Sequence, residues 1–502
     1  MKKIVILMTV LTCLLTSTVQ AVQGDNGYQG GVSASTGWKD TYDYQEVVFI
    51  TGKPVVFSGE VKIKRSVKDD HETITYDYDL KHGESDTLKR KVVFTTNITK
   101  KNDQIVKETV LKSKPSERIN IDGVTYILNN NNMTFSMSTI TDDRPAVDYF
   151  AGNWNGKKVY NVGDGETITV TATGQLYGYD QYWGNTETQE IRFLIEGQVN
   201  QNGIEKSWGG RAEVKSSSTS AQKLLYVDNR PNEISFEGGY LQRQEDNSVL
   251  NYTATLPVFD ANGDPTDRMI TYKDDLNRES FPKQTRLVIP DLKKMKGHWA
   301  ENAVKQLYSL EIYNGNAADF MPNQYMTRAE FAKAIILAGK IAVEEEKETK
   351  RVNPRLRRNQ QQEEQPKVSP YTDVPLNHPY YKYIDALYKT GAMAGYGSRF
   401  NPDGIIDRAQ ALTIFIRVLG LESLAPNPTA VTTFRDNDHI PEWARNAVKV
   451  AAYIGLVRGD EYGYLHPNAP MTKAQASEFL NRLVNYMRSD IVRDYRDRVL
   501  IY

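Results

Sequence analysis

The period of the hydrophobic pattern changes once along this chain, near residue 289. Before that point apolar and polar residues alternate by twos, as in ITYDYDL at 74–80, which is typical of half-buried antiparallel strands. After it, apolar residues recur at helical spacing, as in 331–338. Because 502 residues exceed what one ordinary core holds, the chain is predicted to be multidomain, with an all-β part followed by an all-α part.

The β part is expected to form one or two sandwich-like domains. The segment 124–143 resembles the segment 224–246. Two domains would have the bounds 22–145 and 146–288, and the second would be related to the first if the likeness reflects a duplication.

The first 21 residues have the layout of a secretory signal peptide, with two lysines, an apolar run at 4–15 and the small-x-small site Val19-Gln20-Ala21. The run is too short to favour a membrane span. We therefore expect export and no membrane span after cleavage of 1–21, with an uncleaved N-terminal anchor as the alternative. Cys13 is the only cysteine, so the mature chain would contain no disulfide.

Two further segments are expected to be accessory. The stretch 344–369 is charged and nearly free of apolar residues, a composition that cannot bury enough surface to offset its ordering entropy. It is predicted to be a charged linker. The last residues, 486–502, are predicted to form a helical tail.

One short motif, which we call the repeated phrase, occurs three times in the helical part: YMTRAEFAKAI at 325–335, IIDRAQALTIF at 405–415 and PMTKAQASEFL at 470–480. Each copy contains a four-residue core: TRAE at 327–330, DRAQ at 407–410 and TKAQ at 472–475. The first and fourth positions of this four-residue core fit the capping box, in which two side chains satisfy the free amides of a helix start. The predicted helix caps are Thr327 and Glu330, Asp407 and Gln410, and Thr472 and Gln475. Helix initiation explains both positions without a ligand.

The second position of the core is a cation in every copy: Arg328, Arg408 and Lys473. Capping requires no cation there, and a positive charge in the first helical turn opposes the helix dipole. Free amides, the positive end of the dipole and a long cation together make a site for an anion. Repetition of a common solvent-facing residue is the alternative.

The phrase ends a larger unit that also occurs three times. In the first copy the order is Pro290-Asp291, His298-Trp299-Ala300, a turn, Phe320-Met321-Pro322-Asn323 and then the phrase. These helix–loop–helix copies closely resemble the S-layer homology (SLH) family, over about 289–485. The copies have the bounds 289–343, 370–424 and 425–485.

The resemblance implies a pseudo-threefold bundle whose grooves hold anionic, often pyruvylated, secondary cell-wall polysaccharide. Carried onto this chain, it implies that the polysaccharide-binding residues are Arg328, Arg408, Lys473, Trp299, Tyr381, Trp443, Asp291, Asp373 and Asp436. The alternatives are core packing for the tryptophans, and helix capping or loop bracing for the aspartates.

This chain departs from the family pattern at several positions, so not every groove need be competent. Glu311 stands where a turn glycine is expected, Tyr381 replaces Trp, Asp407 replaces Thr, and Lys473 replaces Arg and loses its bidentate fork. Arg328 and Arg408 are the strongest candidates.

The sequence contains no enzyme constellation, so the chain is not expected to be an enzyme. The histidines lack metal-ligand spacing, and the calcium-like stretch 260–264 is followed by Pro265 where such a loop needs glycine. No catalytic residue, metal or cofactor is predicted. The formal net charge of −1 gives no bulk attraction to nucleic acid or to an anionic membrane.

The predicted function is that of an exported cell-surface protein anchored noncovalently to the cell wall, with its β domains displayed as S-layer or binding modules. Its partners would be the wall polysaccharide and other envelope proteins or copies of itself. A wall-anchored carbohydrate-binding adhesin and a wall-anchored glycan hydrolase are the alternatives.

The aromatic stretch LYGYDQYWGN at 176–185 is expected to be a sugar-stacking face, a protein-contact patch or part of the core.

Overall fold

The computed structural model describes residues 30–33, 40–68, 70–163, 165–201, 204–227, 239–260, 264–343, 368–425 and 431–500. The predicted signal peptide and nearly all of the predicted linker lie outside these residues. Among the helices that are described, none has the length and apolar character that crossing a membrane requires.

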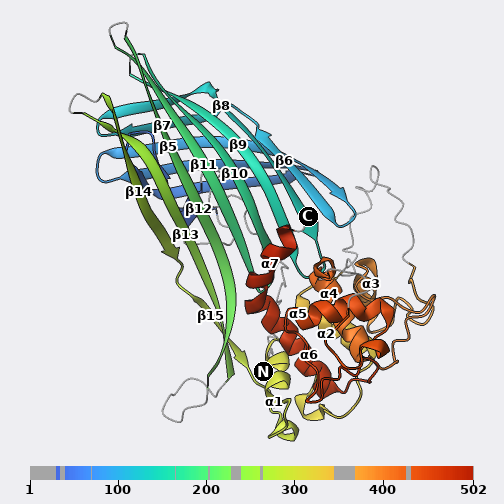
Figure 1. Ribbon diagram of the computed structural model, residues 1–502. Helices are drawn as coiled ribbons and strands as arrows, with labels where there is room; N and C mark the ends of the chain where they lie inside the picture. The colour runs from blue at the N-terminus through green and yellow to red at the C-terminus, as the bar shows by residue number, and fades with distance from the viewer. Residues whose placement is uncertain are drawn as a thin grey trace, which may run out of the picture.

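The N-terminal part is all-β, as predicted (Figure 1). The strands in the described residues are β1 (Val32–Ser33), β2 (Thr41–Val48), β3 (Val55–Lys68), β4 (His71–His82), β5 (Asp86–Lys101), β6 (Gln104–Leu111), β7 (Ser116–Ile121), β8 (Val124–Asp143), β9 (Asp148–Val162), β10 (Glu166–Gln181), β11 (Gly184–Gln201), β12 (Ile204–Val227), β13 (Gly239–Phe259), β14 (Pro265–Glu279) and β15 (Lys283–Val288).

All of these described strands belong to one antiparallel sheet and follow one another in space almost in chain order. β6 and β7 share one position, since each pairs with both β5 and β8. β8 pairs with β9 from the Asp143–Asp148 pair onward. The sheet therefore continues through 145–146, where the sequence placed a boundary between two β domains.

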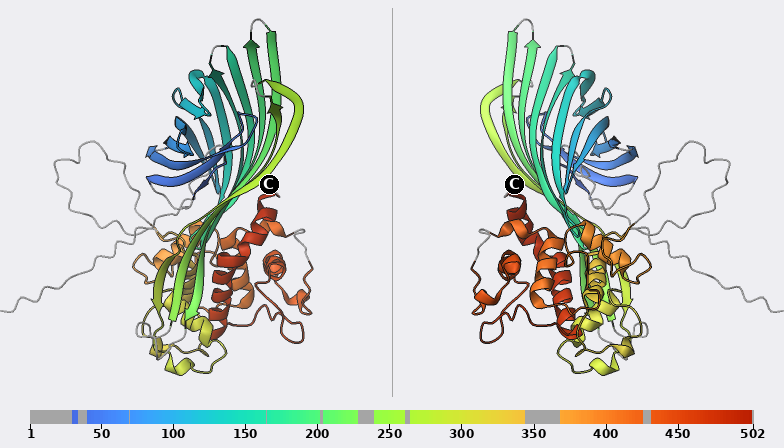
Figure 2. Two further views of the ribbon diagram at one scale, coloured as in Figure 1. Left: turned by 90° about the vertical axis from the view of Figure 1, so that its left-hand side faces the viewer. Right: turned by 90° about the vertical axis from the view of Figure 1, so that its right-hand side faces the viewer.

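The sheet folds over so that its early strands face its late strands. Phe49, directly after β2, contacts Phe193 on β11 and Tyr252 on β13, with ring centroids 5.9 and 5.6 Å apart. Buried side chains from Val32 to Leu256 form one cluster between the facing strands. Figure 2 shows the early strands on one side of the curved sheet and the long later strands on the other. One strongly curved sheet thus encloses one core in a sandwich-like manner.

The C-terminal part is helical, as predicted, and gathers at one end of the sheet (Figure 1). Its described α-helices are α1 (Glu301–Ser309), α2 (Arg328–Gly339), α3 (Tyr381–Lys389), α4 (Arg408–Leu419), α5 (Arg445–Tyr453), α6 (Lys473–Asn485) and α7 (Ile491–Leu500). The short helical turns are η1 (Lys293–Met295), η2 (Ala317–Asp319), η4 (Glu422–Leu424), η5 (Asn437–His439), η6 (Glu442–Ala444) and the π-helical η7 (Tyr486–Asp490). The pairs α1–α2, α3–α4 and α5–α6 correspond to the three sequence repeats.

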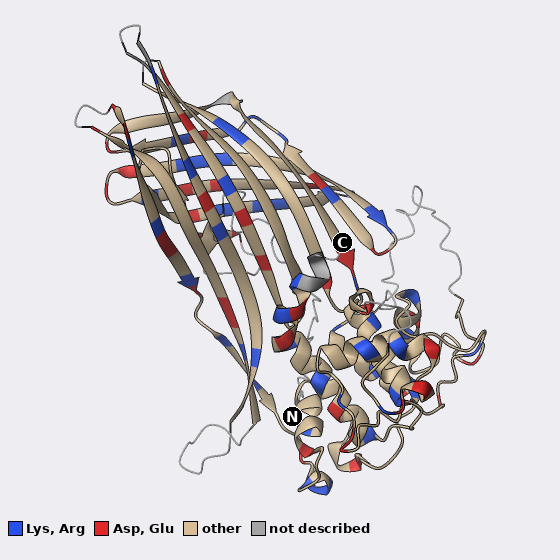
Figure 3. Ribbon diagram, viewed as in Figure 1, with Lys and Arg blue, Asp and Glu red and all other residues tan. Residues whose placement is uncertain are grey.

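Charges of both signs are interspersed along the strands and the helices (Figure 3). This pattern agrees with the formal net charge of −1. A charged ligand would therefore be recognised by local groups and not by a field of one sign over a whole face.

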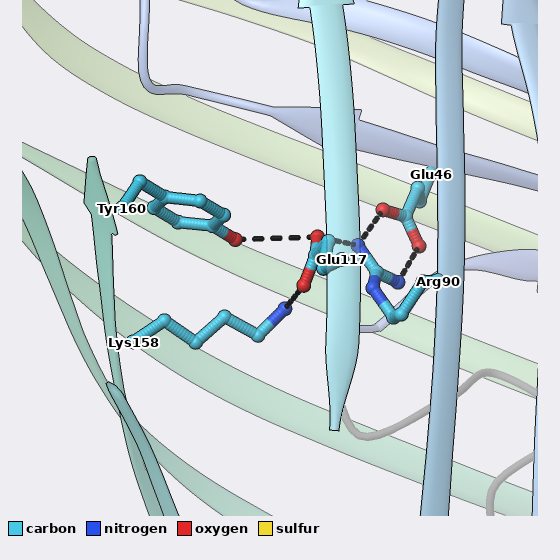
Figure 4. A network of polar contacts seen from close by, with 5 residues as sticks. All are labelled: Glu46, Arg90, Glu117, Lys158 and Tyr160. Atoms are coloured by element: carbon cyan, nitrogen blue, oxygen red, sulfur yellow. Dashed lines mark hydrogen bonds and ion pairs between the residues drawn. The ribbon is translucent and has the colours of Figure 1, made fainter. Parts of the chain in front are cut away.

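A charged cluster is buried inside the β core (Figure 4). The two Nη atoms of Arg90 donate to Glu46 at 2.8 and 2.7 Å, and Nη2 also donates to Glu117 at 2.7 Å. Lys158 Nζ and Tyr160 Oη donate to Glu117 at 2.6 and 3.2 Å. Burial alone would raise the pKa of Glu117, but the charges of Arg90 and Lys158 override it and hold this pKa at about 2. Two cations thus balance two carboxylates across β2, β5, β7 and β9.

Replacing Lys158 by methionine should lower the free energy of unfolding by about 3–5 kcal/mol, because a buried carboxylate loses a partner. The measurement is urea denaturation of the full chain. Lys157→Met is the matched control, since Lys157 precedes Lys158 on β9 and is exposed. A loss for Lys158→Met no larger than that for Lys157→Met would contradict the prediction.

The sheet and the helices share one core. Trp183, between β10 and β11, is 1% exposed and donates from Nε1 to the Ala338 carbonyl of α2 at 2.9 Å. Tyr149 Oη on β9 donates to the Leu419 carbonyl of α4 at 3.0 Å. Both side chains belong to the cluster of buried residues that fills the helical part. The orientation of the sheet on the helices is therefore set by packing.

The aromatic stretch 176–185 forms part of this contact. The ring of Tyr179 meets that of Tyr495 on α7 at 5.0 Å, and the guanidinium of Arg496 lies 5.6 Å from the ring centroid of Tyr177. Of the alternatives drawn from the sequence, the structure supports core and protein contact, and the contact is with the chain's own helices.

Truncating Trp183 to alanine should destabilise the protein by about 3–5 kcal/mol, because it leaves a cavity in the shared core. Thermal unfolding followed by circular dichroism is the measurement, and Tyr182→Ala, at a residue that is 41% exposed, is the matched control. Equal losses for the two variants would show that the shared core contributes nothing at this position.

Candidate functional site at the junctions of the three helical repeats

The repeated phrase starts the second helix of each pair: α2, α4 and α6. The N-cap residues are Thr327, Asp407 and Thr472, and each accepts a hydrogen bond from the amide three residues further on. Glu330 and Gln475 reach back to the cap amides at 3.0 Å, which completes two capping boxes. These contacts set where each helix begins.

The residues just before the caps close a ring of backbone hydrogen bonds. The Met326 amide donates to the Met471 carbonyl at 2.9 Å, the Met471 amide to the Ile406 carbonyl at 3.0 Å, and the Ile406 amide to the Met326 carbonyl at 3.1 Å. All three residues are buried. The ring relates the three helix starts by a pseudo-threefold axis, as the family resemblance implied.

The first amides of each second helix bind a loop of the next repeat around the ring. The Arg328 and Ala329 amides donate to the Gly404 and Pro402 carbonyls at 2.8 and 3.0 Å. The equivalent pairs are Arg408 with Ala469, Ala409 with Pro467, Lys473 with Gln324 and Ala474 with Pro322. We name the contacts the 1–2, 2–3 and 3–1 junctions, after the repeats that supply the helix and the loop. The prediction that these helix starts present free amides is wrong, because the next repeat occupies them.

Arg328 is built into the 1–2 junction and is 4% exposed. Its Nε donates to the Phe400 carbonyl at 3.1 Å, Nη2 to the Ala394 carbonyl at 2.9 Å, and Nη1 to Gln410 Oε1 at 3.0 Å. The guanidinium also lies 4.8 Å from the ring centroid of Phe400 and 5.2 Å from that of Tyr396. Folding therefore does use a cation at this position, through contacts with another repeat.

Gln410 takes part in this junction in place of closing a capping box. Its Oε1 accepts from Arg328, and its Nε2 donates to Tyr396 Oη at 2.9 Å. The cap of α4 therefore rests on the Asp407 carboxylate, which accepts from the Gln410 amide at 2.8 Å.

Arg408, at the 2–3 junction, has an unused donor. Its Nη1 donates to the Leu465 carbonyl, and the side chain is half-buried. In the part of the chain that the structure describes, its buried Nε has no hydrogen-bond partner. Burial lowers the pKa of Arg408, while Asp436 and Asp460 act in the opposite direction. A buried donor without an acceptor costs about 1–3 kcal/mol, which a bound oxygen atom would remove.

Lys473 forms an ion pair at the 3–1 junction. Its Nζ lies 2.8 Å from Glu330 Oε1, and the two side chains are 21% and 29% exposed. Glu330 is the same carboxylate that caps α2. Each second-position cation thus reaches the next repeat, but the three junctions differ in how many of the cation's donors are used.

Asp373 and Asp436 brace the loops that receive the arginines. Each carboxylate accepts two consecutive loop amides at 2.7–2.8 Å, the second of them from Asn401 or His466. Asn401 and His466 have φ of 58° and 56°, the left-handed conformation that side chains other than glycine rarely adopt. Loop bracing, one of the roles considered from the sequence, is the role seen here.

Repeat 1 departs from the other two. Asp291 is exposed and pairs with Lys293 at 3.1 Å. Glu311 has a φ of 59° at the turn where Gly391 and Gly455 have 69° and 77°. The glycine that the sequence pattern lacked is thus replaced by a residue in the same left-handed conformation.

Trp299 and Trp443 are exposed, at 64% and 52%, and are therefore available to a ligand. Tyr381 is half-buried and is the first residue of α3. α1 begins two residues after Trp299, and α3 begins two residues after Pro379. The residue of repeat 2 that is equivalent to Trp299 is therefore Pro379, and the alignment of Tyr381 with tryptophan is wrong.

Two tyrosines of the glycine turns, Tyr396 and Tyr464, were not predicted from the sequence as site residues. Tyr396 is 63% exposed and covers the Arg328 guanidinium. Tyr464 is 38% exposed, stacks on His466 at 5.8 Å, and directly precedes the carbonyl that Arg408 contacts. The sequence feature that could have identified them is a tyrosine directly beside a glycine in two of the three turns.

The family model of the S-layer homology domain matches residues 289–332, 370–412 and 433–477. The C-terminal part of the chain carries three S-layer homology domains. The chain is 27% identical over 192 residues to an amylopullulanase of Thermoanaerobacterium thermosulfurigenes, 32% over 127 residues to a cell surface protein of Thermoanaerobacter kivui, and 23% over 197 residues to an S-layer protein of Bacillus thuringiensis subsp. finitimus.

These similarities cover part of each protein. They span 38%, 24% and 39% of this chain, but only 9%, 16% and 21% of the three relatives. The match to the amylopullulanase rests on the SLH domains and gives no evidence of a catalytic domain in this chain.

Arg328→Met should lower the free energy of unfolding by about 2–4 kcal/mol, because the buried Phe400 carbonyl, the Ala394 carbonyl and Gln410 lose their donor. Lys473→Met should cost at most about 1 kcal/mol, because its ion pair is partly exposed. Urea denaturation of the two full-length variants measures the difference. Equal losses would contradict the structural role assigned to Arg328.

Proposed function

We propose that the chain is a secreted cell-surface protein, held at the cell wall by noncovalent binding of its three SLH domains to an anionic wall polysaccharide. The observation that carries this proposal is the complete set of three SLH domains, a type of segment shared with proteins named as cell surface and S-layer proteins. The curved β-sheet would then be displayed from the wall as a structural or binding module.

The 2–3 junction is the strongest candidate for the binding place. Every side-chain nitrogen of Arg328 already donates within the protein, and Lys473 is paired with a carboxylate. Arg408 keeps a buried donor without a partner in the described residues. A carboxylate on a sugar, such as that of a pyruvate ketal, would gain a charge-assisted hydrogen bond there. The exposed ring of Tyr464 beside the junction offers a face to sugar C–H groups.

The test is sedimentation of the full-length protein with purified cell walls, before and after acid extraction of the wall polysaccharide. We expect binding to be lost on extraction. Arg408→Met should weaken binding to intact walls by about tenfold to hundredfold, the equivalent of one hydrogen bond to a charged group. Lys294→Met, which removes an exposed positive charge from repeat 1, is the matched control.

The outcomes separate the two parts of this proposal. Binding that survives extraction would rule out the polysaccharide as the anchor. Unchanged binding of a folded Arg408→Met variant would remove the 2–3 junction and leave the anchoring itself in place.

A further inference from the structure

A cavity of about 360 Å³ lies within the curved β-sheet, far in sequence from the SLH domains. Its lining comes from β3 to β6 and β8 to β11, and none of the lining residues belongs to the junctions described above. The volume is in the range of sites that hold small molecules. Nothing in the proposed anchoring function uses this space.

One wall of the cavity is a continuous row of aromatic rings. Tyr76 meets Phe94 at 6.0 Å between ring centroids, Phe94 meets Phe135 at 4.8 Å, and Phe135 meets Trp154 at 5.7 Å. All four residues line the cavity. Neighbouring rings are tilted to one another by 72°, 53° and 35°, so the row offers a series of short apolar faces and edges to a ligand.

The lining also contains a buried polar group with an unused acceptor. Gln189 is 2% exposed, and its Nε2 donates to Glu187 Oε1 at 2.8 Å. The carboxylate orients the amide, because only the NH₂ group can face it. Gln189 Oε1 then has no hydrogen-bond partner in the part of the chain that is described. A water molecule or a ligand hydroxyl would satisfy this acceptor.

The lining contains cations and carboxylates side by side. Arg65 is paired with Glu72, and Lys107 and Asp148 also line the space. Burial lowers the pKa of Lys107, and burial together with Asp143 and Asp180 raises the pKa of Asp148 to about 8. A neutral polar ligand suits this mixture of signs better than an ion, because an ion would meet groups of its own sign as well as groups of the opposite sign.

We propose that this cavity is a binding site for a neutral carbohydrate unit, a mono- or disaccharide. A sugar presents C–H groups on its ring faces, which fit the aromatic row from Tyr76 to Trp154. It presents hydroxyls at its edge, which donate to Gln189 Oε1 and both donate to and accept from the charged side chains. A purely apolar ligand would leave that polar side unpaired. This site does not depend on wall anchoring, so sugar binding at the cavity is measured separately from binding to cell walls.

The experiment is saturation-transfer NMR on the full-length protein with cellobiose, maltose and N,N′-diacetylchitobiose, each at up to about 10 mM. Gln189→Leu removes the acceptor, and Ile105→Trp fills the cavity from β6. Glu108→Gln is the matched control, because Glu108 is exposed on the same strand and does not line the cavity. Fluorotryptophan labelling reports the site directly, with Trp154→Phe identifying the Trp154 resonance.

We expect transfer to at least one of these sugars, a shift of the Trp154 resonance on binding, and a loss of affinity of tenfold or more in Gln189→Leu and Ile105→Trp but not in Glu108→Gln. If Gln189→Leu does not fold, Ile105→Trp and the Trp154 resonance decide the question. Transfer to none of the sugars, binding that the cavity-filling variant leaves unchanged, or a sugar-induced shift that spares Trp154 would each overturn the proposal.

Discussion

The three-way ring of backbone hydrogen bonds among Met326, Ile406 and Met471 is the constraint on which the helical part depends. It places the start of each second helix against a loop of the following repeat, so the first two amides of that helix are satisfied by another repeat, while the third amide is satisfied by the helix's own N-cap residue. Each helix start is therefore completed by two repeats together. The cations also act between repeats, since Arg328, Arg408 and Lys473 each contact the next repeat.

The shared core between sheet and helices gives the second constraint. The side chains of Trp183 and Tyr149 extend from the β region into the buried cluster that the SLH helices form. The direction in which the curved sheet projects is therefore fixed relative to the junctions proposed to hold the wall polysaccharide. A binding cavity inside that sheet would be presented at a set angle to the wall, since the contact is packed and hydrogen-bonded and not a flexible tether.

Local chemistry was predictable from the sequence wherever its cause was local. The change of period gave the all-β and all-α parts, and the spacing of Thr327 and Glu330 gave the helix cap. The role of Arg328 was not predictable in this way, because its partners Ala394 and Phe400 lie more than sixty residues away. The alignment of Tyr381 failed for a different reason: the histidines before the two positions, His298 and His378, already align Pro379 with Trp299 in the sequence, and the helix starts agree.

The sequence by itself determined the classes of secondary structure, the three repeats and the cation at each second-helix start, since these follow from periodicity and from short-range capping. Only the tertiary structure decided that the β region is one continuous sheet, and that every side-chain nitrogen of Arg328 donates a hydrogen bond while the buried Nε of Arg408 has no partner among the described residues. Both outcomes depend on which distant carbonyls and side chains come within hydrogen-bonding distance. Those contacts join residues that lie far apart in the chain, and a sequence pattern that relates only near neighbours does not reveal them.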